Sequence, residues 1–381
     1  MSSPLVTINL VVLNGEKYIR HCLDGILAQT YPHELIEVNI LDNGSADKTK
    51  EIINATRSDL EARTDLKDFG FAKFNLVELT KNIGVLPGQE KLLQYSIGKY
   101  VLGLCVDVIV DKDFVKNAIE VMEKDEKIGA LQAKIYKYDI RDLEIGNWKL
   151  EIGGTIDTCG FHIFKSRRVI NIGHGEEDKG PFDSAQDKQF NEQKDIFGVE
   201  GAAPFFRKSA LEDCRLSTNY AIAQNVENSK SKFSREILDH DFFWYGDDLD
   251  LVWRMNMFGW RQVFAPSVIA WHDRQTTKTL RKSQADFIKI RRQIPARKRR
   301  LDWRNTRFTI IKNDYIINIL KDLPYILKRE FMMFGYLVVF EPSVLFEIPE
   351  FLRLIPKMLK KRREVMGRAK TSAKEIHKWF K

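Results

Sequence analysis

Three carboxylates stand close together in residues 244–260, which read WYGDDLDLVWRMNMFGW. Asp247, Asp248 and Asp250 are framed there by tryptophans. Carboxylates that crowd together in an apolar setting repel one another and resist desolvation, so they need a cation, a proton or a substrate hydroxyl. If the segment is helical, Asp250 and Arg254 stand at i, i+4 spacing, which favours a structural ion pair for them. For Asp247 and Asp248 a cation, a proton and a substrate hydroxyl all stay open at this point.

Further polar residues stand where strand-like runs end. Asn14, Asp42, Asn82 and Asp107 each come at or near the end of such a run. Asp107 lies within the apolar segment VLGLCVDVIVD, and because an unpaired buried charge is costly, we expect a cation or hydrogen-bonding partner for it. Asp42 begins the sequence DNGS, for which, taken alone, an Asx turn is favoured over a ligand contact.

The segments that would position these residues alternate between strand and helix patterns. Apolar, β-branched runs begin at residues 5, 36, 74, 99 and 128, and a stretch with helical spacing follows each of the first four. Repeated strand–helix units predict an α/β fold with a mostly parallel, doubly wound sheet. Ligands bind such sheets beyond the carboxyl ends of the strands, so we expect the four polar residues to share one edge. No GxGxxG follows the first run, so the sequence does not predict a dinucleotide site.

Charge divides the chain into an acidic body and a basic tail. Residues 274–381 hold 28 Lys and Arg against 10 Asp and Glu, whereas residues 1–273 hold 33 against 43. The tail contains no recognised nucleic-acid module, so we expect no specific nucleic-acid partner. Within residues 348–359, apolar side chains fall on one helical stripe, and a basic cluster follows. This pattern is typical of an interfacial helix on anionic lipid or of a helix packed on the body.

Several features indicate the compartment. Four widely spaced cysteines without a CxxC pair exclude an obvious zinc site or disulfide framework and are typical of a reducing environment. The first residues lack the basic leader of a signal peptide. No stretch reaches the roughly 17–25 apolar residues of a membrane-spanning helix. We therefore expect a cytoplasmic protein.

Six motifs follow one another in a fixed order. They are TINLVVLNGEKYIRHCLDGILAQTY, VNILDNGSADKT, LTKNIGVLPGQ, GKYVLGLCVDVIVDKDF, VEGAAPFFRKSAL and FFWYGDDLDLVWRMNMFGWRQVFAPSVIAWHD. Together they resemble family-2 glycosyltransferases of the GT-A fold, closest to the rhamnosyltransferase-like branch, over about residues 5–275. The resemblance implies a GT-A (Rossmann-like) catalytic domain over residues 1–275, with a basic, amphipathic helical extension over residues 276–381.

The resemblance implies a site for a nucleotide-diphosphate sugar at the ends of the strands. In the family, the loop after the first strand and the aspartate of the DNGS-like motif hold the nucleoside, and an NxG segment lines the same pocket. The matching positions in this chain are Leu13, Asn14, Asp42, Asn82 and Gly84.

The resemblance also implies a divalent metal, Mg²⁺ or Mn²⁺, that bridges the donor's diphosphate. Asp107 matches the last aspartate of a DxD-like motif, whereas Cys105 stands where a first Asp or Asn is usual. Some relatives supply a histidine from the strand after the acidic motif, and His272 occupies that place. Carboxylate oxygen suits both ions and imidazole nitrogen suits Mn²⁺ better. Asp107 and His272 are therefore the expected metal ligands.

The acidic pair is implied to serve the acceptor. Asp248 matches the family's general base, which removes the proton of the acceptor hydroxyl, and Asp247 is expected to orient it or to contact the acceptor. Trp244 and Tyr245 are candidates for stacking on the acceptor sugar, with aromatic core packing as the alternative. One base without an obvious nucleophile implies a single displacement and an inverted product. The implied acceptor is a lipid-linked oligosaccharide or a polysaccharide. A lipid-linked acceptor favours the lipid interpretation of the tail, so we expect the protein to be peripheral on the inner face of the cell membrane and to contact an anionic membrane surface through residues 276–381.

Two other functions stay open at this point. A metal-dependent phosphoryl-transfer enzyme or hydrolase would need a second carboxylate near Asp107 and a phosphate-binding loop, and the sequence contains neither pattern. The second alternative is a catalytically degenerate, basic GT-A-like scaffold that acts at a membrane or on nucleic acid. Cys105 is the residue that favours this second alternative, because it removes one expected metal ligand.

Overall fold

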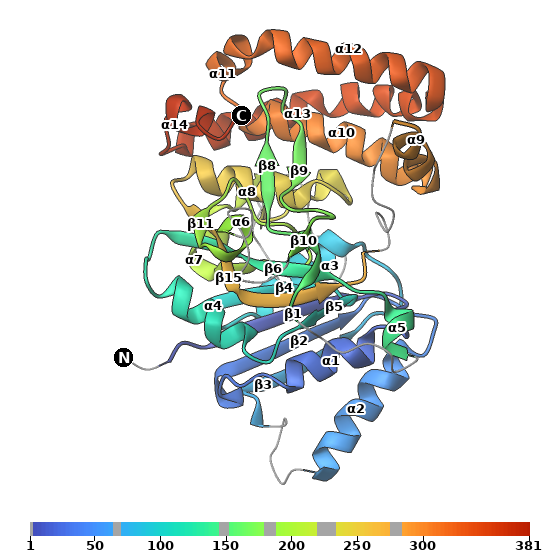
Figure 1. Cartoon of the computed structure of the whole chain (residues 1–381), viewed down its shortest axis with the longest axis vertical. Helices are drawn as coiled ribbons and strands as arrows, with labels where there is room; N and C mark the ends of the chain where they lie inside the picture. Colours follow the sequence, from blue (N-terminus) through green and yellow to red (C-terminus); the bar gives the residue numbers. More distant parts are fainter. Residues whose placement is uncertain (1–2, 64–69, 145–151, 179–187, 219–233, 275–283) are drawn as a thin grey trace. The chain divides into compact units, whose positions relative to one another are not determined.

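The computed structural model describes residues 3–63, 70–144, 152–178, 188–218, 234–274 and 284–381. Contacts within the chain group it into two compact units (Figure 1). Unit 1 comprises Met1–His162, Ile170–Ala210 and Arg261–Lys278, and unit 2 comprises Ile163–Val169, Leu211–Trp260 and Thr279–Lys381. The predicted domain boundary between residues 275 and 276 lies outside the described residues.

The core of unit 1 is an eleven-stranded mixed sheet. Its four parallel neighbours are, in order, β4 (Tyr100–Leu104), β1 (Val6–Val12), β2 (Ile36–Asp42) and β3 (Lys73–Glu78). Strands β1 and β2 are buried almost throughout, as expected for strands that are covered on both faces. The prediction of an α/β sheet built from strand–helix units is confirmed.

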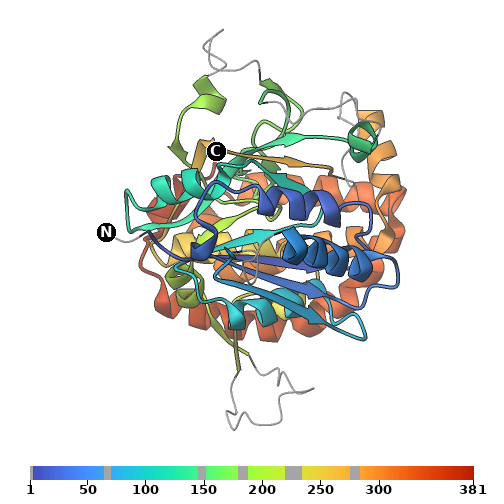
Figure 2. The ribbon, with the colours of Figure 1, turned by 90° about the horizontal axis from the view of Figure 1, so that it is seen from below.

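Helices separate these strands along the chain. They are α1 (Ile19–Leu27), α2 (Thr49–Arg63), α3 (Val85–Tyr95) and α4 (Phe114–Met122), with a short 3₁₀ helix η1 (His33–Leu35) before β2. Figure 2 shows the blue helices α1 and α2 in front of the parallel strands. Ile19, Cys22, Leu23 and Ile26 form the buried face of α1, so the helical spacing in the sequence predicted the packing of α1 correctly.

The other half of the sheet reverses direction. Strand β12 (Phe205–Arg207) runs antiparallel between β4 and β6 (Ile128–Lys137), and β15 (Arg261–His272) runs parallel to β6. The remaining strands are β5 (Val108–Val110), β7 (Gly154–Thr158), β10 (Glu177–Asp178) and β11 (Lys194–Asp195), each of which pairs antiparallel with a neighbour. Short helices α5 (Ile140–Glu144) and α6 (Lys188–Asn191) lie between them in sequence.

The segment that begins at residue 99 is not one continuous strand, and this prediction was wrong. Strand β4 ends at Leu104, the chain turns at residues 105–107, and β5 then pairs antiparallel with β15 instead of continuing the parallel set. Asp107 therefore lies in a turn, with 24% of its side chain exposed, and not inside an apolar strand. A carboxylate is costly to bury without partners, which accounts for the break at this position.

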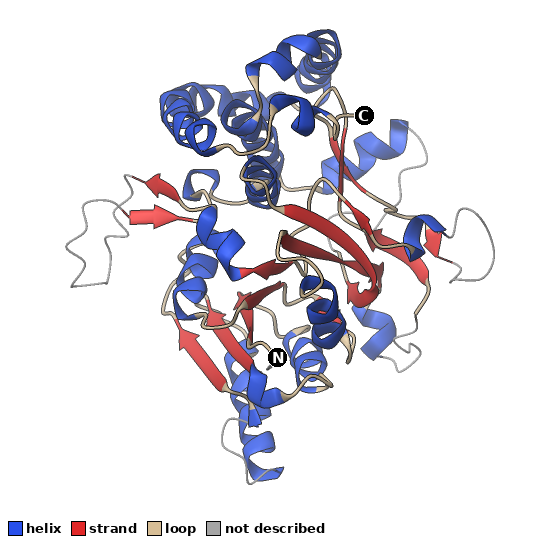
Figure 3. Ribbon diagram, turned by 90° about the vertical axis from the view of Figure 1, so that its left-hand side faces the viewer, coloured by secondary structure: helices blue, strands red, loops and turns tan. Residues whose placement is uncertain are grey.

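Unit 2 is mostly helical, and Figure 3 shows its helices in blue. The helices are α8 (Asp247–Met257), α9 (Gln284–Gln293), α10 (Ala296–Asn313), α11 (Ile316–Lys321), α12 (Leu323–Phe340), α13 (Ile348–Arg368) and α14 (Ala373–His377). The 3₁₀ segments η3 (His240–Phe242) and η4 (Pro342–Glu347) precede α8 and α13. Strands β13 (Leu216–Thr218) and β14 (Ser234–Glu236) of unit 2 pair with each other. Strands β8 (Phe161–Ile163) and β9 (Val169–Asn171), whose residues are divided between the two units, form another two-stranded sheet. Helix α7 (Lys208–Asp213) follows β12.

Helix α13 carries the apolar stripe found in the sequence, and unit 2 buries part of it. Met358 is buried and the ring of Phe351 stacks on that of Phe308 in α10 with centroids 5.1 Å apart, whereas Leu352 and Leu359 are 58% and 45% exposed. Part of the stripe therefore packs on protein, and a lipid contact for the rest stays a prediction. No helix in the described part of the chain is long and apolar enough to cross a membrane alone, although α12 and residues 342–368 pass that test as a pair bent by 113°.

Candidate functional site

The loops after β1 and β2 are tied to each other. Asn14 adopts a left-handed conformation (φ 51°), its backbone N–H donates to the Ser45 hydroxyl at 2.9 Å, and its side-chain oxygen accepts from the N–H of Ala46 at 2.9 Å. Asp42 is fully buried, accepts from the N–H of Ser45 at 3.2 Å and lies 3.5 Å from the Lys50 ammonium. The turn interpretation of Asp42 thus describes its local structure, and these bonds fix the edge of the sheet at this point.

The loop after β3 is held to the same edge through Asn43. Asn82 accepts from the N–H of Gly84 at 2.7 Å, and Gly84 (φ 94°) begins α3. The Asn43 side chain accepts from the N–H of Ile83 at 2.9 Å and donates to the carbonyl of Gly84 at 3.1 Å. The structure therefore brings the predicted donor residues of β1, β2 and β3 to neighbouring loops. Asn43 was not singled out in the sequence, because Asn within an Asn-Gly turn needs no further explanation.

Asp107 and His272 meet at the end of the β5–β15 pair. The His272 Nε2 atom lies 3.4 Å from a carboxylate oxygen of Asp107, and its Nδ1 atom lies 2.9 Å from a carboxylate oxygen of Asp157. A second link joins the backbones, since the N–H of Asp273 donates to the carbonyl of Asp107 at 3.1 Å. When His272 is neutral, its Nδ1–H donates to Asp157, so the lone pair is on Nε2, the atom that faces Asp107. Metal-ligating histidines usually have this arrangement.

Two further charged residues complete this cluster. The Arg274 guanidinium donates to Asp157 at 2.8 Å and to Glu200 at 2.9 Å, and the backbone carbonyl of Asp157 lies 2.8 Å from His174 Nδ1. Asp157 and Arg274 were not predicted. The signal that could have identified them is weak, because 115 residues separate Asp157 from His272 and no motif spacing links the two. Arg274 directly follows the last quoted motif.

The charges of the cluster shift one another's protonation. Burial by itself would raise the pKa of Asp157, but hydrogen bonds from His174, His272 and Arg274 hold that pKa well below its usual value. Burial by itself would lower the pKa of His272, but the hydrogen bonds to Asp107 and Asp157 raise it to about 9. Without a competing cation, His272 is therefore protonated at neutral pH and neutralises part of the acidic charge.

The pair Asp107 and His272 fits two adjacent ligands of a divalent ion. Ligands that bind an octahedral ion at about 2.1 Å lie about 3 Å from each other, close to the 3.4 Å between these two atoms. Cys105 does not join them, because burial raises the pKa of its thiol and the thiol faces the carbonyl of Gly201 at 3.5 Å. Among the described residues no group of three His, Cys, Asp or Glu could hold a metal. A bound ion would therefore share these two ligands with donor oxygens and water.

The predicted acidic pair belongs to unit 2, where Asp247 and Asp248 begin α8. The loop before α8 is unusual, because Phe243, Tyr245 and Gly246 all have positive φ. A non-glycine residue in this conformation is strained and persists only where its surroundings hold it. Three backbone carbonyls of this loop accept from the side chain of a single residue in α10, Asn305. These carbonyls belong to Phe242, Trp244 and Tyr245, at 2.9, 2.8 and 2.7 Å.

The aromatic residues of this segment divide into two groups. Trp244 is 44% exposed and lies 4.6 Å, between ring centroids, from Tyr245, whose other partner is the Lys298 ammonium at 3.7 Å from the ring. Trp253 is fully buried in α8 and serves the core. Trp244 thus keeps the exposure that a sugar-stacking surface requires, whereas Tyr245 is only half-buried and its ring already contacts Trp244 and Lys298. The predicted ion pair of Asp250 with Arg254 is confirmed at 3.0 Å, fully buried.

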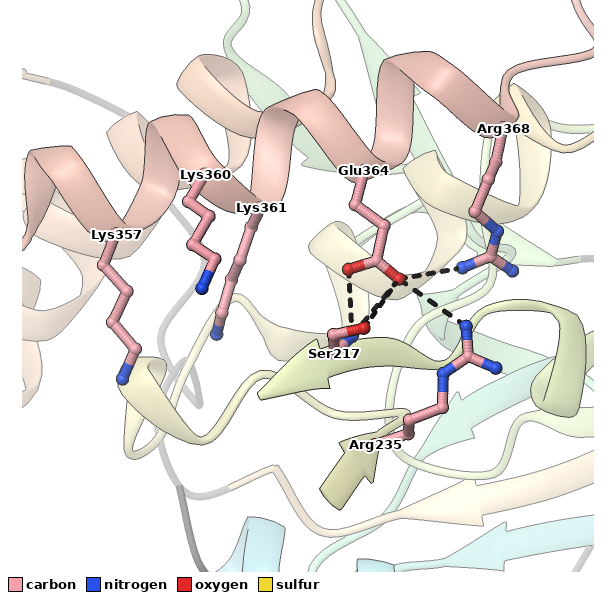
Figure 4. Close-up of a pocket in the computed structure, with 7 residues that line it drawn as sticks. All are labelled: Ser217, Arg235, Lys357, Lys360, Lys361, Glu364 and Arg368. Atoms are coloured by element: carbon pink, nitrogen blue, oxygen red, sulfur yellow. Dashed lines mark hydrogen bonds and ion pairs between the residues drawn. The ribbon is translucent and has the colours of Figure 1, made fainter. Parts of the chain in front are cut away.

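A basic pocket of about 660 Å³ is also part of unit 2 (Figure 4). It is lined by Ser217, Arg235, Lys357, Lys360, Lys361, Glu364 and Arg368. Glu364 accepts from the backbone N–H of Ser217 and pairs with Arg235 and Arg368, and Lys361 binds Asp239 and Asp241. Several of the pocket's cations are therefore already paired with carboxylates, and none of the predicted site residues lines it.

Comparison with known proteins agrees with the fold. The glycosyl transferase family 2 model matches residues 7–215. The structure of GalNAc-T7 with UDP, GalNAc and Mn²⁺ superposes with a TM-score of 0.57 at 11% identity, covering 98% of this chain and 56% of that one. S. aureus TarS 1–349 in complex with UDP-GlcNAc gives a TM-score of 0.50 at 14% identity, covering 98% of this chain and 90% of the TarS chain. Both likenesses show the fold, GT-A.

Curated relatives match over shorter segments. Glycosyltransferase GlyA of Streptococcus pneumoniae is 26% identical over 38% of this chain and 16% of its own length. The dolichyl N-acetyl-α-D-glucosaminyl phosphate 3-β-D-2,3-diacetamido-2,3-dideoxy-β-D-glucuronosyltransferase of Methanococcus voltae is 27% identical over 32% of this chain and 35% of its own length. Glycosyltransferase AglE of Haloferax volcanii is 45% identical over 13% of this chain and 16% of its own length. The matches thus span about a third or less of these relatives. Since the family model covers more than half of the chain, the chain belongs to glycosyl transferase family 2.

Proposed function

We propose that this protein transfers a sugar from a nucleotide-diphosphate sugar to an acceptor hydroxyl with inversion at the anomeric carbon. The observation that carries the proposal is the arrangement at one edge of unit 1. Asp107, His272 and Asp157 converge at the end of the β5–β15 pair, and the loops with Asn14, Asp42 and Gly84 are linked to one another. A set of polar groups at the strand ends of an α/β sheet is where such a donor binds.

The donor would be held by residues with separate tasks. Leu13, Asn14 and Asp42 would contact the nucleoside, and Asn82 and Gly84 would line the same pocket. Asp107 and His272 would hold Mg²⁺ or Mn²⁺, which supplies positive charge to the diphosphate when bound. Asp157 holds the His272 ring in the orientation in which the Nε2 atom of His272 is directed at Asp107.

The acceptor chemistry would belong to unit 2. Asp248 removes the proton of the acceptor hydroxyl while that oxygen forms a bond to the anomeric carbon, from the face opposite the diphosphate. The bond between the anomeric carbon and the diphosphate oxygen breaks, and the nucleoside diphosphate leaves with that electron pair. Asp247 orients Asp248 or contacts the acceptor, and Trp244 and Tyr245 stack on the acceptor sugar. The exposure of Trp244 and the bonds from Asn305 to the backbone of both residues support this role.

The acceptor and the location follow from several features together. The Methanococcus voltae relative carries a dolichyl phosphate substrate in its name, which supports a lipid-linked oligosaccharide as the acceptor here, with a polysaccharide as its extended form. All four cysteines are free, which supports a reducing, cytoplasmic location. The protein would be peripheral on the inner face of the cell membrane, held at an anionic surface by residues 276–381, without a specific nucleic-acid partner. The sugar would be a hexose or rhamnose.

One alternative is a GT-A-like scaffold without activity, at a membrane or on nucleic acid. The observation that favours it is the thiol of Cys105 in place of a metal ligand, because burial raises the pKa of this partly buried thiol well above its usual value.

Donor hydrolysis separates the two functions. Purified protein with Mn²⁺ or Mg²⁺ is offered UDP-, GDP- and dTDP-sugars, and water stands in for the acceptor. We expect metal-dependent release of one nucleoside diphosphate. Asp248→Asn should lower this turnover by about 10²–10⁴-fold with donor affinity intact, because the base is lost and the donor site is not. Absence of turnover together with absence of donor binding in calorimetry would instead establish the scaffold.

A further inference from the structure

Helices α11 and α12 and the 3₁₀ segment η4 expose an unusual number of large apolar side chains. Of the 18 residues of α12 only Leu337 is buried. Thirteen large apolar side chains on the three elements are each at least 36% exposed, and Phe331, Phe346 and Val339 reach 80%, 74% and 68%. We call this set the apolar face: Ile316, Ile317, Leu320, Leu323, Tyr325, Leu327, Phe331, Met332, Phe334, Val338, Val339, Phe340 and Phe346. Exposed apolar side chains in this number on three consecutive elements indicate a protein or membrane contact.

The acidic side chains of this region do not interrupt the apolar face, because they are paired with basic groups. Asp322 binds Arg167 at 2.6 Å and the imidazole of His377 at 3.0 Å. Glu341 is 2% exposed and binds Arg291 at 2.8 Å.

Glu330 is likewise paired, with Arg307 in α10. Lys321 and Lys328, in contrast, are exposed. The exposed surface of α11, α12 and η4 therefore combines apolar side chains with positive charge, which complements an anionic bilayer.

The geometry favours a helix that lies along the bilayer surface over one that crosses the bilayer. At 1.5 Å per residue, the 18 residues of α12 extend about 27 Å, but Lys328, Arg329 and Glu330 interrupt the apolar sequence. The chain bends by 113° into residues 342–368, and α13 then packs on α10. A segment that is packed within unit 2 cannot supply the second half of a span.

We propose that α11, α12 and η4 dock on an anionic lipid bilayer, with the apolar face at the boundary between headgroups and acyl chains. Lys321 and Lys328 lie at the level of the lipid phosphates. This proposal deepens the proposed function and rests on it for the lipid-linked acceptor, since docking would bring unit 2 to the surface that carries that acceptor. Helix α13, which has the basic cluster recognised in the sequence, is not the inserting element.

Vesicle co-sedimentation of the full chain tests the proposal. The vesicles contain phosphatidylcholine alone or with phosphatidylglycerol. We expect binding that is stronger with phosphatidylglycerol. The double variant Phe331→Ser, Val339→Ser should bind at least about tenfold more weakly, because two apolar side chains leave the bilayer. Lys321→Gln with Lys328→Gln should mainly reduce the preference for phosphatidylglycerol, by about fivefold per lysine.

The matched control is Leu352→Ser with Leu359→Ser. Both leucines are exposed, at 58% and 45%, but they lie on α13, outside the apolar face. This control should bind vesicles like the wild type, and circular dichroism should show that all variants fold.

Wild type that does not sediment with vesicles would overturn the proposal, as would equal binding by the Phe331/Val339 variant. A wild-type dimer in ultracentrifugation that the same variant dissociates would assign the face to a second copy of the chain. Donor hydrolysis, measured on the same samples, reports on the transferase separately. A protein that fails to bind vesicles but still hydrolyses the donor would overturn only the docking proposal. A protein that binds vesicles but does not hydrolyse the donor would overturn only the transferase proposal.

Discussion

The proposed metal site depends on Asp157, although Asp157 is not one of the proposed metal ligands. Its carboxylate binds His272 Nδ1 at 2.9 Å and Arg274 at 2.8 Å, and it is fully buried. Asp157→Asn removes the charge that orients and polarises the imidazole. We expect the affinity for Mn²⁺ in the presence of nucleoside diphosphate to fall by about 10–100-fold. Calorimetry or the electron paramagnetic resonance of Mn²⁺ measures this affinity.

Asp195→Asn is the control for this variant, because Asp195 forms an ion pair with Arg261 at 2.7 Å with both side chains nearly half exposed. It should leave the metal affinity unchanged. If Asp157→Asn folds and binds Mn²⁺ like the wild type, Asp157 does not position His272 for metal, and its cluster with Arg274 is purely structural.

The sequence identified the strand-end residues but not the partners that hold them. Asn14, Asp42 and Asp107 could be predicted to share an edge, because parallel strands end together and each residue follows such a strand. Asp157 and Arg274 could not be predicted, because their contacts join segments more than 100 residues apart and depend on how β7 and β15 pair with β6. The roles of all these residues in binding the donor stay predictions.

At the scale of elements, the loop before α8 depends on α10. The Asn305 amide donates to three carbonyls of residues 242–245, where two non-glycine residues have positive φ. Asn305→Leu removes these donors, so we expect the loop to relax and the acidic pair behind it to shift. The free energy of unfolding should fall by about 1–3 kcal/mol, and turnover with acceptor should fall more than donor affinity does. Thermal unfolding, steady-state kinetics and calorimetry measure the three quantities, and unchanged acceptor kinetics would contradict the role given to the loop.

A buried ion network joins α10 to η3 and α8. The Lys312 ammonium is fully buried, contacts Asp239 and lies 3.0 Å from Asp250. Lys312→Met would remove a positive charge that balances these buried carboxylates, so we expect the free energy of unfolding to fall by about 3–5 kcal/mol. Lys357→Met is the control, because Lys357 pairs with Asp241 at a site where its own side chain is 30% exposed. Chemical denaturation measures both, and equal effects would contradict the importance of burial.

The same network sets a pH dependence. Burial by itself would raise the pKa of Asp239, but Lys312 and Lys361 hold it well below the usual value. A depressed folded-state pKa contributes stability that is present above the unfolded value of about 4 and is lost as the pH falls below it. We therefore expect the wild type to lose stability on acidification below about pH 4, and Lys312→Met to lose less over the same range. Denaturation at several pH values tests this, and parallel curves for the two proteins would contradict it.

Element prediction from sequence succeeded where one face of a helix or both faces of a strand are buried. The stripes of α1 and the apolar runs of β1 and β2 behaved as periodicity predicts. Element prediction failed at residues 99–111, because an uninterrupted apolar run does not show where one strand ends and the next, paired with a different strand, begins. The stripe of α13 was ambiguous for a related reason, since an apolar face indicates burial without saying whether protein or lipid covers it.

At the scale of the whole molecule, the proposed donor residues lie in unit 1 and the acidic pair and apolar face in unit 2. Variants of unit 2 such as Asp248→Asn should therefore change transfer and leave donor affinity within about twofold of the wild type. The charge difference between the body and the tail predicted two parts with different tasks. It could not predict that residues 211–260 group with the tail, because that grouping arises from tertiary contacts.

The most direct measurement is a calorimetric titration of UDP, GDP and dTDP into the full chain, with and without Mn²⁺. Our account predicts that one of the three binds, that binding needs the metal, and that Asp107→Asn weakens it at least about tenfold while Asp248→Asn does not. If none of the three binds in the presence of Mn²⁺, the edge of unit 1 is not a donor site, and the scaffold alternative replaces the transferase.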